Sequence, residues 1–438
     1  MVSSDSIQSA LSPSFRWWRY RIFFFTWASY VIYYFSRKNF PVTKADLISD
    51  LALTEIQLGY IETAYLALYA VGQFCNGALG DVLGGRRIVA AGMLLSAILN
   101  LLFGLPLSTS VLWLSSLWAL NGYVQSTGWP GNVQVMAQWY GVHERGTVMG
   151  LWCTNFQIGG VIANAFAALL LAYWGWRSTY IGPFFVVGIF AVLYFFLVKE
   201  TPKDAGFHTG NGIGSREQPY GTSLDQGAML IGEEDENKWA IIKQVLRVPM
   251  VWYMGFTYFC LKFIRYGLIF WLPLYFVQEM GYSPAHAGLA ATLFEIGGVP
   301  SVIVIGLISD RFFQSRRGPI SSLPLFFLAG FCLIQHLLGR AGPMWAMMGF
   351  AMMGFTLYGP DSLMCGAGAM DFGTKKGAST AAGLINGLGS VGAIFQGLII
   401  PRLKLLAGWH GIFILFFAIS LISAFIMLSQ WNTVPDKE

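Results

Sequence analysis

Apolar residues are grouped along this chain into long blocks bounded by charged residues, Gly or Pro. Each block has about twenty residues, the length of a helix that spans a bilayer. The pattern predicts twelve membrane-spanning helices and therefore an all-α membrane protein. Their approximate bounds are 21–41, 57–79, 86–104, 111–137, 146–172, 177–198, 248–278, 286–309, 319–338, 343–368, 376–400 and 406–429.

The two halves of the chain resemble each other. The sequence GALGD (Gly77–Asp81) recurs as GLISD (Gly306–Asp310), 229 residues later. Three further pairs follow in the same order, with the offset rising slowly to 233: WPGN with GPDS, ERGTVMG with KKGASTAAG, and GWRSTYI with GWHGIFI. Four ordered matches predict two pseudo-symmetric six-helix bundles, and transporters built from such repeats hold the substrate between the halves near mid-membrane.

Composition supports this assignment. Of 438 residues, 55% are hydrophobic and only 11% are charged, whereas a soluble domain has about 25% charged residues. The net charge of +5 does not indicate nucleic-acid binding, because the basic residues form no stripe on a soluble face. The five cysteines lie in apolar blocks without a C-x-x-C pair, so we expect no metal site and no cofactor. The absence of a P-loop or a catalytic His/Cys cluster argues against an enzyme.

The connections between helices predict orientation and domain boundaries. Lysines and arginines are concentrated in the connections on the side of the N-terminus, and the positive-inside rule places that side, with both termini, in the cytoplasm. Residues 199–247 are polar, Gly-rich and locally acidic, which is typical of a linker. We expect an N-terminal bundle over 1–198, a cytoplasmic linker over 199–247 and a C-terminal bundle over 248–438.

Two arginines lie within the apolar blocks at equivalent positions. Arg37, in the stretch YYFSRKNF, lies about fifteen residues into the first helix, and an offset of 228 leads to Arg265 in the seventh. At 1.5 Å per residue both lie roughly 22 Å along their helices. A central arginine costs about 2.5–3.5 kcal/mol to insert, so the pair indicates a function that needs two facing positive charges. Two guanidinium groups match a dianionic phosphoryl group. The alternative is that each arginine reaches an interface or pairs with a buried acid.

Polar and aromatic residues near these positions are candidate substrate contacts. Tyr34 and Tyr266 neighbour the arginines in sequence, and Trp129 lies in a predicted helix of the first half. Aromatic residues at helical spacing more often serve packing. Asn155 and Asn386 correspond at an offset of 231, and as buried amides they would bind a substrate hydroxyl or each other.

Further charges accompany the arginines. Lys262 shares a helix face with Arg265, whereas Lys38 follows Arg37 directly and points elsewhere. We expect Glu295 of the eighth helix to pair with Lys38 across the two halves, as an ion pair that forms or breaks during transport. Pairing of Glu295 with Lys262 or Arg265 is the alternative.

Two loops share a known pattern. GALGDVLGGRR contains Asp81, Arg86 and Arg87, and GLISDRFFQSRRG repeats its start with Asp310 and Arg311. The pattern resembles the cytoplasmic signature loop of the major facilitator superfamily. That resemblance implies that these residues tie the halves together on the cytoplasmic side. A basic turn that merely obeys the positive-inside rule is the alternative for either loop alone.

Longer motifs resemble one family within that superfamily. The stretches YYFSRKNF, STGWPGN, ERGTVMGLW, FIRYGLIFW, LFEIGGVP, YGPDSLM and KKGASTAAGLINGLGSVGA are similar to those of organophosphate:phosphate antiporters. The resemblance implies that Arg37 and Arg265 are the phosphate-binding arginines. The chain departs from the glycerol-phosphate branch at Gln73 and Phe156, where that branch has a lysine and a histidine. The resemblance therefore does not imply glycerol-3-phosphate itself as the substrate. The stretch NGYVQSTGWP is more similar to the eukaryotic sugar-phosphate exchangers, which favours a larger or different phosphorylated substrate.

The expected function is exchange of an organic phosphate for inorganic phosphate by alternating access, in a monomer embedded in the lipid bilayer. The cell (inner) membrane is the expected location, or the endoplasmic reticulum in a eukaryote. A membrane sensor of an organic phosphate is one alternative. A proton-coupled anion symporter, with Glu62 or Asp361 as the titrating group, is another.

Overall fold

The computed structural model describes residues 13–140, 148–149, 151–207, 243–313, 316–338, 342–365 and 378–433. Within these ranges the chain is almost entirely helical, no strand occurs, and each of the twelve predicted spans lies largely on helix. Seven helical stretches of the described residues are long and apolar enough to cross a membrane by length and composition. The predicted all-α architecture is therefore observed.

The helices fall into two groups along the chain. The N-terminal group contains α2 (Pro13–Tyr33), the 3-10 turn η1 (Tyr34–Ser36), α3 (Asn39–Leu51), α4 (Glu55–Leu83), α5 (Gly85–Gly104), α6 (Val111–Gln125), α7 (Gly128–Trp139), α9 (Asn155–Trp174) and α10 (Ser178–Leu197). The C-terminal group contains α13 (Pro249–Met280), α14 (Pro284–Phe312), α15 (Arg317–Leu338), α16 (Pro343–Cys365) and α18 (Ala378–Ser429). Most of the predicted linker lies outside the described residues; its described part includes the short turn η2 (Lys203–Ala205).

Four of the predicted spans differ from the simple pattern of one block and one helix. The first is broken into α2, η1 and α3, and the fourth is broken between α6 and α7. The last two spans together form α18, in which Gly408 has a φ of 63° and interrupts the helical backbone. Glycine tolerates this left-handed φ because it has no Cβ. A hydropathy pattern reports apolar length and does not reveal such breaks.

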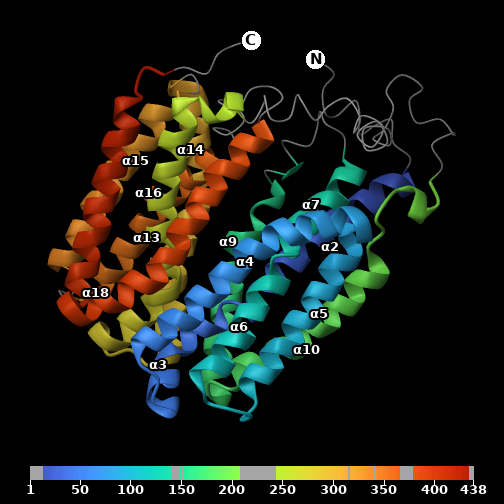
Figure 1. The fold of residues 1–438 in the computed structure, drawn as a ribbon, viewed down its shortest axis with the longest axis horizontal. Helices are drawn as coiled ribbons and strands as arrows, with labels where there is room; N and C mark the ends of the chain where they lie inside the picture. Colours follow the sequence, from blue (N-terminus) through green and yellow to red (C-terminus); the bar gives the residue numbers. More distant parts are fainter. Residues whose placement is uncertain are drawn as a thin grey trace.

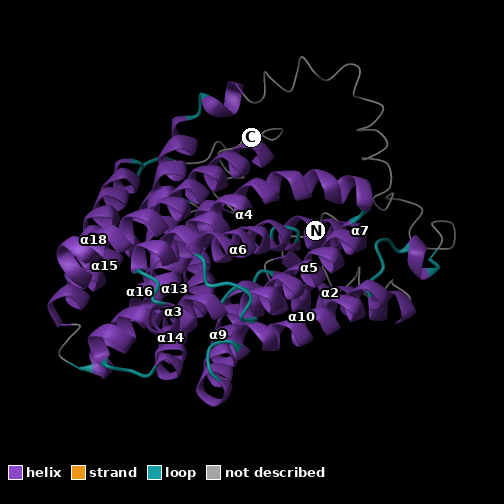
Figure 2. Ribbon diagram, turned by 60° about the horizontal axis from the view of Figure 1, so that its bottom comes forward, coloured by secondary structure: helices purple, strands orange, loops and turns teal. Residues whose placement is uncertain are grey.

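The two bundles meet at one end of the molecule (Figure 1). We call one end of the molecule the near end; α2 begins there and α4 ends there. We call the opposite end the far end; α3 ends there and α4 begins there. The described chain begins in α2 and ends after α18 toward the near end, and the bundles approach each other most closely toward the far end (Figure 1). Figure 2 shows the same helices from another side.

Polar contacts close the far end. Gln278 of α13 donates a 2.9 Å hydrogen bond to Glu55 of α4, which also forms an ion pair with Lys404 of α18. Backbone contact supports this closure, because a Cβ at Gly59 would collide with the carbonyl oxygen of Gly397. Among the described residues, the side chains that form these hydrogen bonds and ion pairs between the two bundles lie in the half of the molecule toward the far end or near its middle. The structure is therefore closed at the far end.

Candidate functional site

The break in the first span shapes the site. Arg37 has a φ of −124° and ends η1, and the backbone N–H groups of Arg37 and Lys38 both donate to the carbonyl of Tyr34. The break removes the normal helical partner of the Ser36 carbonyl. Non-helical backbone at membrane depth persists only where the protein itself satisfies its polar groups.

Amide side chains from two neighbouring helices satisfy that carbonyl. Asn121 and Gln125 of α6 each donate to the Ser36 oxygen at 2.9 Å, and Asn100 of α5 donates at 3.3 Å. All three amides are buried. This polar group holds the break in place and so fixes where Arg37 leaves the helix.

Arg37 is buried among neutral groups. Its side chain is 8% exposed, and its Nε donates a 3.0 Å hydrogen bond to Gln125 Oε1. Its guanidinium carbon lies 4.9 Å from the ring centroids of Tyr34 and Tyr69 and 5.8 Å from that of Tyr65. These rings stabilise the cation through their quadrupoles. Among the described residues, no carboxylate pairs with Arg37.

Arg265 has a different environment. It lies within the continuous helix α13, and its Nη1 forms a 2.9 Å ion pair with Asp361 Oδ2 of α16. The guanidinium carbon lies 4.6 Å from the Tyr358 ring centroid and 5.5 Å from that of Phe156, which belongs to the opposite bundle. The Arg265 side chain retains 12% exposure. The two arginines are therefore equivalent by repeat position and unequal in charge environment.

The two arginines approach the same part of α9. The Tyr34 ring centroid lies 4.9 Å from the guanidinium carbon of Arg37. Tyr34 also packs against Gly159 of α9, and the adjacent turn of α9 provides Phe156 to Arg265. The interface between the bundles thus brings one arginine from each repeat to the same region.

Lys38 and Glu295 connect the bundles beside the arginines. Lys38 Nζ lies 2.5 Å from Glu295 Oε1, and both side chains are nearly fully buried. The Glu295 carboxylate lies so close to Gly160 of α9 that a Cβ there would overlap it. Of the two pairings predicted for Glu295, the structure has the one with Lys38. Lys262 instead donates a 2.7 Å hydrogen bond to Asn386 and lies over the Tyr258 ring.

The remaining candidate contacts are distributed unevenly. Tyr266 lies beside Arg265, with 5.9 Å from its ring centroid to the guanidinium carbon. Trp129 packs in an aromatic cluster with Tyr30 and Trp152 of the N-terminal bundle, and no contact between Trp129 and either arginine occurs in the described structure.

Of the two roles predicted for the amides of Asn155 and Asn386, the hydrogen bond between them does not occur in the structure, and binding of a substrate hydroxyl stays a prediction. Asn386 is exposed and bonds Lys262, whereas Asn155 is buried and neither polar atom of its amide has a hydrogen-bond partner. Asn155 therefore does not bond Asn386. The repeat offset matched their positions along the helices, but the two helices have different neighbours.

The signature loops are only partly described. The side chains of Asp81, Asp310 and Arg311 lie outside the described residues. Arg86 donates to the Val198 carbonyl at 3.4 Å and lies over the Phe195 ring, and Arg87 is exposed. The described contacts of Arg86 thus lie within the N-terminal bundle, and the role of the signature loops in tying the two halves together stays a prediction.

A missed residue explains this local arrangement. The Glu200 carboxylate accepts backbone N–H groups of Gly85 and Arg86 at 2.7 and 2.8 Å. A carboxylate at a helix N-terminus satisfies free N–H groups and complements the helix dipole. Glu200 therefore caps α5 from the segment that follows α10.

Other partners in the site were also missed. Gln125 was recognisable only as a polar residue in an apolar block, and the sequence did not indicate that Asp361 faces Arg265. A further group, which we call the far-end cluster, consists of Lys44, Glu62, Trp271 and Gln396. Lys44 and Glu62 form a 2.7 Å ion pair with no exposed surface, Gln396 donates to Glu62, and Lys44 Nζ lies 3.4 Å from a Trp271 ring centroid.

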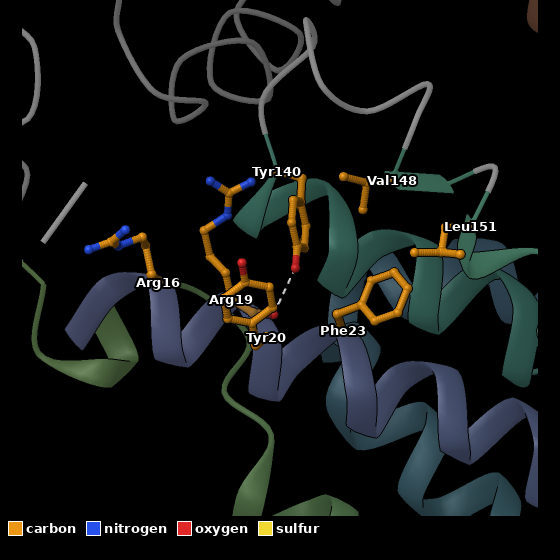
Figure 3. Close-up of a pocket in the computed structure, with 7 residues that line it drawn as sticks. All are labelled: Arg16, Arg19, Tyr20, Phe23, Tyr140, Val148 and Leu151. Carbon is orange, nitrogen blue, oxygen red and sulfur yellow. Dashed lines mark hydrogen bonds between the residues drawn. The ribbon is translucent and has the colours of Figure 1, made fainter. Parts of the chain in front are cut away.

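A surface pocket of about 310 Å³ lies elsewhere, at the near end (Figure 3). Its lining residues all belong to the N-terminal bundle: Arg16, Arg19, Tyr20, Phe23, Tyr140, Val148 and Leu151. The hydroxyl of Tyr140 donates a 2.7 Å hydrogen bond to the Arg19 carbonyl (Figure 3). Because a single bundle forms this pocket and neither central arginine lines it, it is not the site between the repeats.

Comparison with known proteins identifies the family of this chain. Residues 26–397 match the family model of the Major Facilitator Superfamily. The chain is 30% identical to a probable hexose phosphate transport protein of Chlamydia trachomatis serovar D, covering 98% of this chain and 95% of the relative. It is also 30% identical to the glycerol-3-phosphate transporter of Bacillus subtilis, with 98% and 96% covered. The chain belongs to the organophosphate:phosphate antiporter family of the major facilitator superfamily. The fold class and family predicted from the sequence are thus confirmed.

Not all relatives in this family are named as transporters. The chain is 27% identical to the membrane sensor protein UhpC of Escherichia coli, with 98% of this chain and 95% of the relative covered. Among solved structures, an inward-facing bacterial homologue of the human lysosomal transporter Spinster has a TM-score of 0.75 at 14% identity, with 95% of this chain and 97% of the other covered. That likeness concerns the major facilitator fold alone.

Proposed function

We propose that this protein exchanges an organic phosphate for inorganic phosphate by alternating access, with the phosphoryl group bound between Arg37 and Arg265. The observation that carries the proposal is the pair of guanidinium groups, one from each repeat, beside the same part of α9: the Tyr34 ring beside Arg37 packs against Gly159, and the Phe156 ring lies 5.5 Å from the guanidinium carbon of Arg265. A doubly negative phosphoryl group complements two such cations. The named activities of the Chlamydia and Bacillus relatives support this substrate class.

The charge balance supplies a reason for obligatory exchange. Arg37 has no carboxylate partner among the described residues, and a buried charge without a counter-charge is costly. The carrier without a ligand therefore changes conformation slowly. Binding of inorganic phosphate or of an organic phosphate neutralises the charge and removes this energetic cost. Because a ligand shifts a conformational equilibrium only through differential affinity, both exchanged substrates need to neutralise this site.

The ion pair between Lys38 and Glu295 is proposed to participate in gating. It joins α14 to the first span beside the arginines and is nearly fully buried. Separation of the bundles at this level would break it, so we expect it to form and break during the transport cycle. The exchange rate of a Glu295→Gln variant tests this role.

Counterflow in proteoliposomes tests the proposed function. Vesicles loaded with inorganic phosphate are expected to take up labelled phosphate and labelled hexose phosphate, and Arg37→Ala is expected to abolish both. Uptake into vesicles without internal phosphate, or exchange that survives Arg37→Ala, would contradict the proposal. Acid-driven uptake without a counter-substrate would instead identify a proton-coupled symporter.

A sensor is the second candidate function, favoured by the similarity to UhpC. A sensor would bind hexose phosphate with the same arginines and give no counterflow. Calorimetric binding on the purified protein, measured beside the vesicle assay, separates the two functions: binding with flux indicates an antiporter and binding without flux a sensor.

Orientation, boundaries and oligomeric state remain predictions. We propose that the near end faces the cytoplasm, that residues 199–247 link bundles 1–198 and 248–438, and that the protein functions as a monomer in the cell (inner) membrane. The basic connections at the near end support this orientation.

A further inference from the structure

The surface pocket at the near end has a cationic end and an apolar end. Figure 3 shows Arg16 and Arg19 of α2 at one end of it. Phe23, Val148 and Leu151 lie toward the other end. Its volume of about 310 Å³ is at the lower end of the range for small-molecule sites, roughly 300–1,000 Å³. A ligand that fits both ends needs a negatively charged group joined to an apolar part.

Contacts within the N-terminal bundle fix the cationic end. The guanidinium carbon of Arg19 lies 4.4 Å from the ring centroid of Tyr140, and the Tyr140 hydroxyl donates to the Arg19 carbonyl. Tyr140 thus holds both the side chain and the backbone of Arg19. Arg16, three residues earlier, lies at the rim of the pocket, is half-buried and forms no ion pair within the described part of the chain. The positive charge of Arg16 is therefore available to an anion.

Exposed aromatic residues indicate the depth of this end in the membrane. Trp17 and Tyr20 are exposed beside the two arginines, and Trp and Tyr side chains are enriched where the headgroups meet the hydrocarbon region. Phe23 lies four residues after Arg19, about 6 Å further along the helix axis. The cationic end of the pocket therefore lies at the depth of the lipid headgroups, and the apolar end lies toward the hydrocarbon.

The apolar end opens toward the outer surface of the N-terminal bundle. Leu151 is exposed, and so are Ile162 and Leu169 of α9, which follow it by 11 and 18 residues. These separations are close to three and five helical turns, so the three side chains lie on about the same face. A row of exposed apolar side chains along a membrane-spanning helix is the surface that contacts lipid. A lipid of the surrounding bilayer thus reaches the pocket beside Leu151.

We propose that this pocket binds an anionic phospholipid of the bilayer at the near end. The headgroup phosphate binds to Arg16 and Arg19, and the first part of an acyl chain lies against Phe23 and Leu151. Among the described residues that line the pocket none is acidic, so a zwitterionic headgroup would leave its own cation without a counter-charge. Basic pockets between membrane helices bind anionic headgroups in this way. The site is separate from the central arginines, and lipid binding is the same for an antiporter and a sensor.

Mass spectrometry of the intact protein–lipid complexes in detergent tests the proposal on the full-length protein. It gives dissociation constants for phosphatidylglycerol and phosphatidylcholine with identical acyl chains. We expect Arg16→Gln and Arg19→Gln each to weaken phosphatidylglycerol about fivefold and to leave phosphatidylcholine unchanged. Arg21→Gln is the matched control, because Arg21 has the same charge on the same part of α2 but lies over the Trp17 and Trp18 rings and does not line the pocket. We expect it to change either affinity less than twofold.

Two results would overturn the inference: equal affinities of the unaltered protein for the two lipids, or equal losses in Arg16→Gln and Arg21→Gln. Arg16 is half-buried at the rim, so its replacement decides the question if Arg19→Gln fails to fold. Excess inorganic phosphate distinguishes a lipid from a soluble anion. It should leave phosphatidylglycerol bound, because it has no apolar part. Displacement would show that the pocket binds free phosphate, which would also overturn the inference. None of these results depends on the counterflow assay.

Discussion

At the scale of single residues, buried neutral groups determine the direction and the charge environment of the Arg37 side chain. Gln125 is the central one: its Oε1 accepts hydrogen bonds from Arg37 Nε and from the Tyr65 hydroxyl, while its Nε2 donates to the Ser36 carbonyl. One amide thus links the helix break to the side-chain direction of the arginine. Because its partners are neutral, the positive charge of Arg37 remains available to a ligand. An acidic residue in the place of Gln125 would neutralise that charge.

Replacement of Gln125 should weaken phosphate binding without removing any charge. Gln125→Met has a similar volume but no polar atoms, so Arg37 Nε and the Ser36 carbonyl would lose a partner. We expect the dissociation constant for phosphate to rise about tenfold or more and the protein to lose about 1–3 kcal/mol of stability. Calorimetry and thermal unfolding measure the two effects. Unchanged phosphate affinity would show that Gln125 does not position Arg37.

At the scale of helices, close approach between α9 and α14 brings Glu295 to Lys38. The absence of a side chain at Gly160 leaves the space that the Glu295 carboxylate occupies. The same helix α9 also receives Tyr34 at Gly159 and provides Phe156 to Arg265. Small residues at such an interface let the helix backbones approach closely, so α9 is the element on which both arginines and the Lys38–Glu295 ion pair depend.

A methyl group at Gly160 should therefore disturb the ion pair between Lys38 and Glu295, which we propose to take part in gating. Gly160→Ala places a Cβ where the Glu295 carboxylate lies, and we expect exchange to slow at least as much as in Glu295→Gln. Gly330→Ala is the matched control, because a Cβ at Gly330 meets no atom within 4 Å. Exchange rates in proteoliposomes decide the matter. If Gly160→Ala and Gly330→Ala exchange equally fast, the space at Gly160 does not limit transport.

At the scale of the whole molecule, the far-end cluster lies where the two bundles close on each other. Lys44 and Glu62 belong to the N-terminal bundle, but Trp271 and Gln396, which cover them, belong to the C-terminal bundle. Opening of the far end would remove this cover and let water reach the ion pair. A buried ion pair is often less stable than apolar residues of similar volume, whereas loss of one partner is strongly destabilising. The cluster therefore affects the balance between closed and open far ends.

Single and double substitutions in this cluster should act in opposite directions. Glu62→Gln leaves Lys44 buried without its counter-charge, at a cost of about 3–5 kcal/mol, and should favour an open far end. Lys44→Met with Glu62→Met replaces the pair by apolar side chains and should stabilise the closed far end by about 1–4 kcal/mol.

Spin labels at two exposed far-end positions, Leu107→Cys and Leu406→Cys, measure the separation of the bundles. We expect longer distances in the single variant and shorter or narrower distributions in the double variant. Shifts in the same direction in both would rule out this account of the cluster.

The sequence by itself determined which segments are helices and where the two arginines lie along them. Block length specifies a membrane span, and a repeat in the chain specifies equivalent positions such as Arg37 and Arg265. It did not reveal the break at η1, because hydropathy measures apolar length and not backbone continuity.

Only the tertiary structure decided the partners of the charges: Gln125 for Arg37, Asp361 for Arg265 and Glu295 for Lys38. These partners lie on other helices, 88, 96 and 257 residues away along the chain. Whether two such side chains meet depends on how each helix is rotated and how closely its neighbours approach. Rotation and approach are set by packing between helices, and the pattern of residues within a single helix does not predict them.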